Sequence, residues 1–194
     1  MKKTALILAA GIAGLGIFWL ATTSRGATEQ APYTVVRTDG SYEVRDYQEL
    51  QTARVPLRDG GMDGSFGQLF RYITGANESA AKIAMTAPVL IDRTTGRETM
   101  SFILPKATAE SGAPAPRGET VSLGKVPATR YAVFRFSGGR STENEKAARE
   151  KLAAWVRAKK LEPRGEPVFA YFDPPWTPAF LRRNELMQPV AKVK

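Results

Sequence analysis

The chain has 194 residues, of which 43% are hydrophobic and 24% charged, as is typical of one globular domain with a packed core. Its 28 Lys and Arg against 19 Asp and Glu give a net charge of +9, which favours anionic partners such as carboxylates, phosphates or an anionic membrane surface. The absence of Cys and His excludes disulfides, thiolate nucleophiles, Ser-His-Asp and Cys-His catalysis, and His-ligated metals. No zinc-finger, helix-turn-helix or aromatic-basic RNA-binding motif occurs, so no nucleic-acid partner is expected.

The N-terminus combines a basic start, Lys2 and Lys3, with an apolar run over residues 4–23. A run of this length can span a bilayer as an uncleaved anchor, and a basic start with an apolar run also fits a cleaved signal peptide. Both interpretations stay open, and residues 1–31 are assigned to this segment and its linker. The positive-inside rule keeps the two lysines in the cytoplasm, so we expect a membrane-anchored or secreted protein with its domain on the periplasmic or extracytoplasmic side.

Alternating polar and apolar residues predict strands from Tyr33 onward, notably over residues 42–47 and 53–57. A helix is predicted next, because Phe66, Leu69, Phe70 and Ile73 recur at helical spacing on one apolar face. Residues 82–89, which include Met85, are expected to be extended. A helix that leads into a strand forms the kind of junction where a ligand groove can lie.

The second half repeats this order of elements. A strand predicted over residues 99–104 ends the first half, and an exposed connector rich in Ala, Gly and Pro follows at 106–119. The second half begins with strands predicted over residues 121–123 and 129–136. A capping box, Thr142 with Glu145, predicts the start of a second helix that runs to about Lys160. Its predicted buried residues are Ala148, Leu152, Trp155 and Val156. Strands over residues 167–173 and 185–187 complete the chain.

Four pairs of segments in the two halves are separated by about 80 to 85 residues, which indicates an internal duplication. The predicted fold is α+β: a distorted antiparallel β-barrel from a duplicated ββαββ-like unit with two flanking helices, plus an N-terminal apolar helix.

The chain contains, in this order, the motifs YEVRDYQELQTARV, FGQLFRYITGAN followed by KIAMTAPVLI, MSFILP, and YFDPPWTPAFLRRNELM. These motifs and their order resemble the SOUL, or heme-binding protein, family. The resemblance covers roughly residues 32–187 and implies a SOUL-like domain over residues 32–191. It also implies a twofold-repeated α+β barrel, shared with bacterial drug-sensing effector-binding domains.

The resemblance implies a carrier or buffer for heme or a related tetrapyrrole, bound in an apolar groove beside the first helix. By position, Phe70 would line that groove, Arg71 would meet a propionate, and Trp176 would cover a porphyrin face. Arg182 and Arg183 are further propionate partners, whereas Thr177 stands where the family can have Lys. Each of these residues also fits a purely structural role, in the core, on a solvated surface or in an ion pair.

Because the chain has no His, the resemblance implies binding without His ligation of the iron. The nearest candidates for an axial ligand are Tyr72, Tyr171 and Met85, each of which also fits a core position.

Two other functions remain open. One is a general binding module for amphipathic small molecules, for which a Glu on the sheet, Glu98 or Glu185, would be the diagnostic feature. The other is a membrane-associated interaction protein. No paired-carboxylate motif is present, so no enzymatic activity is expected.

Overall fold

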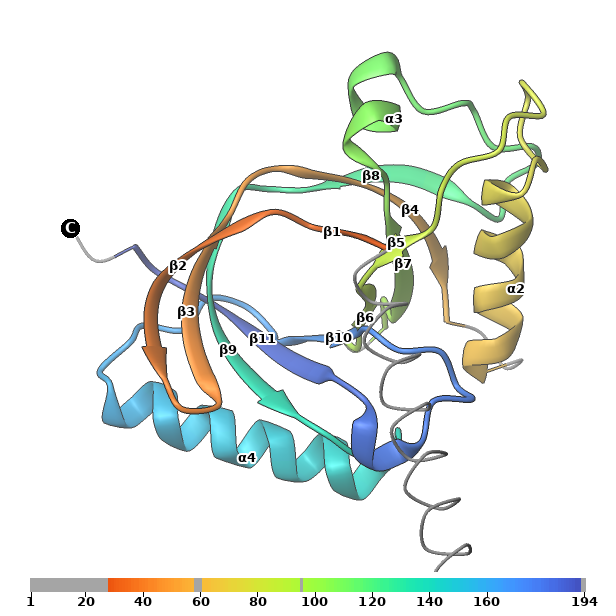
Figure 1. The fold of residues 1–194 in the computed structure, drawn as a ribbon. Coiled ribbons are helices and arrows are strands. Elements are labelled where there is room, and N and C mark those ends of the chain that lie inside the picture. Colours follow the sequence, from red (N-terminus) through yellow and green to blue (C-terminus); the bar gives the residue numbers. More distant parts are fainter. Residues whose placement is uncertain (1–27, 58–60, 95, 193–194) are drawn as a thin grey trace, which may run out of the picture.

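The computed structural model describes residues 28–57, 61–94 and 96–192, so the predicted N-terminal apolar helix lies outside them. Nine strands form one curled antiparallel sheet in the order β2-β3-β9-β11-β10-β6-β7-β4-β8 (Figure 1). They are β2 (Tyr33–Asp39), β3 (Tyr42–Tyr47), β4 (Leu50–Pro56), β6 (Val89–Asp92), β7 (Thr99–Ile103), β8 (Ser122–Val126), β9 (Thr129–Phe136), β10 (Val168–Tyr171) and β11 (Asn184–Val190).

The strand order confirms the predicted duplication. One unit runs β3-β4-α2-β6-β7 and the other β8-β9-α4-β10-β11, where α2 is Gly61–Ile73 and α4 is Thr142–Ala158. The two units meet where β6 pairs with β10, and each lends its first strand to the other: β3 pairs with β9 and β8 with β4. The α+β class is therefore confirmed, with the sheet curled into a half-barrel that ends at β2 and β8.

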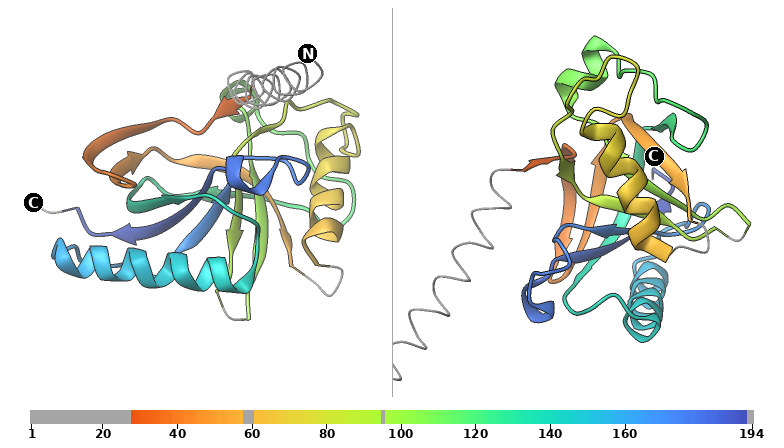
Figure 2. Two further views of the ribbon diagram at one scale, coloured as in Figure 1. Left: turned by 60° about the horizontal axis from the view of Figure 1, so that its bottom comes forward. Right: turned by 90° about the vertical axis from the view of Figure 1, so that its right-hand side faces the viewer.

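Both helices cover the outer, convex face of the sheet (Figures 1 and 2). Helix α4 buries the four residues that its periodicity predicts, Ala148, Leu152, Trp155 and Val156. Its N-cap is Ser141, whose hydroxyl accepts a hydrogen bond from the amide of Asn144 at 3.3 Å. The predicted capping box is thus wrong by one residue, because Thr142 already lies inside the helix.

Helix α2 buries a different stripe from the predicted one. Leu69 and Ile73 are buried as expected, but Phe66 and Phe70 are 37% and 47% exposed. The buried stripe is turned toward Tyr72, whose hydroxyl donates to the carbonyl of Pro114 at 2.9 Å and so can be buried at little cost.

The inner, concave face of the sheet has its own apolar cluster, which includes Tyr47, Tyr131, Val133, Ala170 and Met187. It arises because side chains alternate between faces along each strand.

Short elements accompany the large sheet and the two long helices. Residues Glu29–Gln30, assigned to the linker by the sequence, form β1, which pairs in parallel with β5 (Thr86–Ala87). The predicted connector contains α3 (Lys106–Ser111). No helix of the described part of the chain is both long and apolar enough to cross a membrane.

Candidate ligand-binding groove

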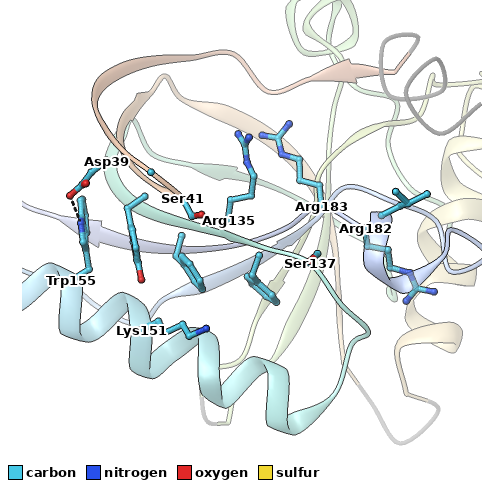
Figure 3. A pocket seen from close by; sticks show the side chains of 13 residues that line it. Asp39, Ser41, Arg135, Ser137, Lys151, Trp155, Arg182 and Arg183 are labelled. Atoms are coloured by element: carbon cyan, nitrogen blue, oxygen red, sulfur yellow. Dashed lines mark hydrogen bonds between the residues drawn. The ribbon is translucent and has the colours of Figure 1, made fainter. Parts of the chain in front are cut away.

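A surface groove of about 970 Å³ lies at the end of β9, where the tip of the β2–β3 hairpin, helix α4 and the loop before β11 meet (Figure 3). That loop contains η1 (Ala179–Leu181). The groove forms because β9 continues past the start of β3: the amide of Arg135 still bonds the carbonyl of Ser41, but Phe136 has no residue of β3 beside it.

A row of four aromatic rings lies along this groove. Trp155 stacks on Tyr42 with ring centroids 5.0 Å apart, Tyr42 stacks on Phe134 at 4.8 Å, and Phe134 stacks on Phe136 at 5.8 Å. Trp155 and Phe134 are largely buried, whereas Tyr42 and Phe136 are half-buried. The accessible parts of Tyr42 and Phe136 give the groove an apolar lining.

Cations reach the groove from both faces of the sheet: Lys151 from the outer face, where the aromatic row lies, and Arg135 from the inner face. Figure 3 shows the guanidinium groups of Arg135 and Arg183 pointing to the same side of β9, with Lys151 of α4 on the other side. The ammonium of Lys151 lies 5.9 Å from the centroid of the Phe134 ring. Asp39 is the one acid among the described residues that line the groove, and it is paired with the ammonium of Lys159 at 2.7 Å and the indole of Trp155 at 3.0 Å.

The side chain of Glu185 lies directly below these arginines, fully buried on the inner face of β11. It accepts two hydrogen bonds from Arg45, at 2.7 and 3.1 Å, and two from Arg183, at 2.9 and 2.7 Å. A longer bond of 3.4 Å comes from Arg135. Burial by itself would raise the pKa of Glu185, but the hydrogen bonds and charges of Arg45 and Arg183 outweigh it and hold that pKa below its ordinary value.

This cluster carries an excess of positive charge. Three guanidinium groups, of Arg45, Arg135 and Arg183, face two carboxylates, of Glu43 and Glu185, which leaves one net positive charge. Arg45 is almost completely buried, whereas the side chain of Arg135 is 48% exposed. The surplus charge can therefore reach a ligand through Arg135, and the groove suits an anion better than a cation.

A second, smaller cavity of about 320 Å³ lies on the inner face of the sheet. Its apolar walls include Tyr47, Leu90, Tyr131 and Met187, and its charged groups are Arg54, Lys125, Asp92 and Glu166. Of the two glutamates singled out in the sequence, Glu185 is buried beside this face and Glu98 is exposed. The cavity thus has mixed charge.

The structure disperses the residues that the sequence proposed for tetrapyrrole binding. Arg182 and Arg183 line the groove at the end of β9. Phe70 and Arg71 are exposed on α2, where Phe70 stacks on Phe66 at 6.0 Å, and neither residue lines either cavity. Trp176 is 83% exposed in the loop before β11.

The residues proposed as iron ligands lie in the core or pack against it. The buried hydroxyl of Tyr171 donates to Glu145 at 2.8 Å, and the guanidinium of Arg140 covers its ring at 4.3 Å. Met85 packs against the outer core cluster. Burial raises the pKa of Tyr72 and, aided by Glu145, of Tyr171, so neither is inclined to form a phenolate ligand.

Sequence reasoning did not identify Lys151, Arg135 or the aromatic row as parts of a site. The alternation that places Phe134 and Phe136 on one face of β9 was recognised, and so was the burial of Trp155. Their junction with Tyr42 depends on the pairing of β3 with β9, strands about 90 residues apart, which no local pattern reveals.

Together these features describe a small α+β domain with a surface groove lined by aromatic rings and cations. The family model described as SOUL heme-binding protein matches residues 28–189. The chain therefore belongs to the SOUL heme-binding protein family. A search of curated proteins found no significant match.

Solved structures share the fold at low sequence identity. The C-terminal domain of EcmrR superposes with a TM-score of 0.55 at 15% identity, over 83% of this chain and 99% of that one. A structure described as an uncharacterized conserved protein from Listeria innocua gives 0.56 at 12% identity, over 78% and 92%. Another from the same organism, described as a hydrolase, gives 0.53 at 10% identity, over 80% and 94%. Identities this low show a common fold and nothing further.

Proposed function

We propose that this protein binds heme or a related tetrapyrrole reversibly, as a carrier or buffer, and that the groove at the end of β9 is the binding site. The observation that carries the proposal is the aromatic row of Trp155, Tyr42, Phe134 and Phe136 flanked by cations. A tetrapyrrole combines a flat apolar ring with carboxylates, which matches this lining. The protein belongs to the SOUL heme-binding protein family, so heme is the expected ligand.

Each part of the groove has a separate task in this proposal. The aromatic row removes the apolar ring from water, which stabilises the complex in proportion to the area buried. Arg135, whose side chain lines the groove and is 48% exposed, and Lys151 pair with the ligand's carboxylates through charge-assisted hydrogen bonds. Arg183 is already bound to Glu185, so it positions the cluster and contributes charge.

The residues that line the groove suit the porphyrin ring and its carboxylates better than they suit the iron. The described residues contain no group of three or more His, Cys, Asp or Glu that could hold a metal ion. Since Tyr72 and Tyr171 are buried and hydrogen-bonded, we propose that no side chain ligates the iron and that metal-free protoporphyrin binds as well as hemin.

The outer face of α2 offers a second place for the same ligand, since Phe66 and Phe70 expose a stacked pair beside Arg71. This is the surface that the family resemblance implies. The groove at the end of β9 is favoured because it combines a longer aromatic row with Lys151 on the same face of the sheet and Arg135 from the inner face.

A second candidate function is the general binding of amphipathic small molecules on the inner face of the sheet. The cavity of about 320 Å³ favours it. The carboxylate of Glu185 is occupied by Arg45 and Arg183, which makes it a poor partner for a cationic ligand and a poor general base.

The test is an absorbance titration of residues 28–194, a piece that contains the whole sheet, both long helices and both core clusters. Hemin and protoporphyrin IX are titrated separately. Saturable one-to-one binding of both, with similar affinity, supports the proposal. Saturable binding of neither overturns it, and binding of hemin alone overturns the claim that no side chain ligates the iron.

A further inference from the structure

The loop between β10 and β11 exposes two large aromatic side chains. Trp176 is 83% exposed and Phe180 is 76% exposed, the highest values among the large hydrophobic residues of the described chain. Neither residue lines the groove or the inner cavity. Apolar side chains that project together into solvent commonly mark a contact with a partner.

Hydrogen bonds within the loop fix the backbone that carries both side chains. The amide of Thr177 donates to the carbonyl of Pro174 at 3.0 Å, and Arg182 donates from Nε to the carbonyl of Thr177 at 2.7 Å. At the end of the loop the amide of Arg183 donates to the buried carboxylate of Asp173 at 2.5 Å. The loop is therefore organised before any partner arrives, which lowers the entropy cost of binding.

This loop lies beside the point where the N-terminal segment joins the domain. Arg183 donates to the side chain of Gln30 at 3.4 Å, and Figure 2 (right) shows β1 and the loop on the same side of the molecule. The apolar run of the sequence ends at Thr23, five residues before Thr28. Five extended residues span about 18 Å at most, so a bilayer that held this run would lie within that distance of Thr28.

The charge of this region suits an anionic surface. The loop contributes Arg182, whose guanidinium donates to the carbonyls of Thr177 and Pro175, whereas Arg183 is paired with Glu185. The acidic residue of the loop, Asp173, is buried. Removing Lys2, Lys3 and Arg25 from the total of +9 leaves residues 28–194 with a net charge of +6.

We infer that the loop around Trp176 and Phe180 is a membrane contact, whose two aromatic side chains enter the interfacial region of an anionic bilayer. Trp is enriched at that depth because its ring is apolar and its N–H remains hydrated. The contact would orient the domain on the membrane, independently of whether the N-terminal segment is retained.

The experiment uses residues 28–194 and vesicles of phosphatidylcholine and phosphatidylglycerol in equal amounts. We expect co-flotation with these vesicles and a blue shift of tryptophan emission, which reports on Trp176 because Trp155 is already buried. Trp176→Ala and Phe180→Ala should each weaken vesicle binding about tenfold. Trp176→Phe should retain binding and lose the emission shift, and Leu123→Ala, which removes an exposed apolar side chain from β8, should change neither.

Three results would overturn the inference. The first is no co-flotation with the anionic vesicles. The second is co-flotation that the double variant Trp176→Ala, Phe180→Ala leaves unchanged, because the contact would then lie elsewhere on the basic surface. The third is a blue shift that develops with protein concentration in the absence of vesicles and tracks dimer formation by sedimentation, because the loop would then bind a second copy of the chain.

Discussion

Arg45 and Glu185 form a two-point ion pair on the inner face of the curled sheet, with nitrogen–oxygen distances of 2.7 and 3.1 Å. The two residues are 140 positions apart and come from the two repeated units, and their side chains are 1% and 0% exposed. The guanidinium of Arg45 also lies 4.3 Å from the centroid of the Tyr33 ring. The pair therefore links both halves of the domain beneath the proposed groove.

Glu185→Leu should lower the free energy of unfolding by about 3 to 5 kcal/mol, because it leaves buried guanidinium groups without their carboxylate. Urea denaturation of residues 28–194 measures the effect. The double variant Arg45→Met, Glu185→Leu should recover part of the loss, since it removes the unpaired charge as well. A loss below about 1 kcal/mol for Glu185→Leu would show that the cluster adds little to stability.

Stability should fall in acid through Glu185. Its pKa is held below the ordinary value of 4.5, so its contribution is fully present above that pH and is lost as the pH falls through the folded-state pKa. Urea midpoints measured as a function of pH should decline below about 4.5 for the wild type and decline less steeply for Glu185→Gln. The pKa of Asp46 is lowered by Arg130, so Asp46 also makes stability fall in acid. This part of the pH dependence remains in the Glu185→Gln variant. Parallel curves for the two proteins would contradict the assignment.

Ser141→Ala should destabilise the domain by about 1 kcal/mol, because the amide of Asn144 loses its capping acceptor. Thr142→Ala is the matched control, since Thr142 is exposed and lies inside the helix. Thermal unfolding of both variants measures which of the two residues caps the helix. A larger effect for Thr142→Ala would restore the capping box that the sequence predicts.

Lys151→Gln should weaken tetrapyrrole binding about three- to tenfold, because it removes a partner of the ligand's carboxylate. Lys146→Gln is its control, as another exposed lysine of α4 that does not line the groove. The absorbance titration measures both. Equal affinities for the two variants would show that Lys151 is not part of the site.

Phe136→Ala should weaken tetrapyrrole binding about tenfold, because it shortens the aromatic row. Phe70→Ala removes an exposed aromatic side chain from α2 and should leave the affinity unchanged. The same titration compares them. The opposite order of effects would place the ligand on the outer face of α2.

The sequence predicted local structure well where one face of an element is buried. The alternation over residues 129–136 predicted a strand with the same bounds as β9. Helical spacing predicted the four buried residues of α4. It failed where a tertiary contact changed the balance: Tyr72 could be buried through its bond to Pro114, which turned Phe66 and Phe70 toward solvent.

The candidate site was harder to predict because its parts are distant in sequence. Arg182 and Arg183 were proposed from the family resemblance and do line the groove. Lys151 resembles any exposed lysine on a helix, and Tyr42 becomes part of the aromatic row only through the pairing of β3 with β9. Glu185 was recognised as a residue to examine. Arg183 is only two residues away, but the other partners, Arg45 and Arg135, are brought to Glu185 by the strand order β3-β9-β11.

The most direct test of the proposed site is an NMR titration of residues 28–194 with metal-free protoporphyrin IX, whose ring current shifts nearby nuclei. We expect saturable shifts confined to the end of β9, the tip of the β2–β3 hairpin and the part of α4 around Lys151. Shifts confined instead to α2 around Phe70, to the inner cavity around Tyr131, or to no residue at all would contradict the proposed site.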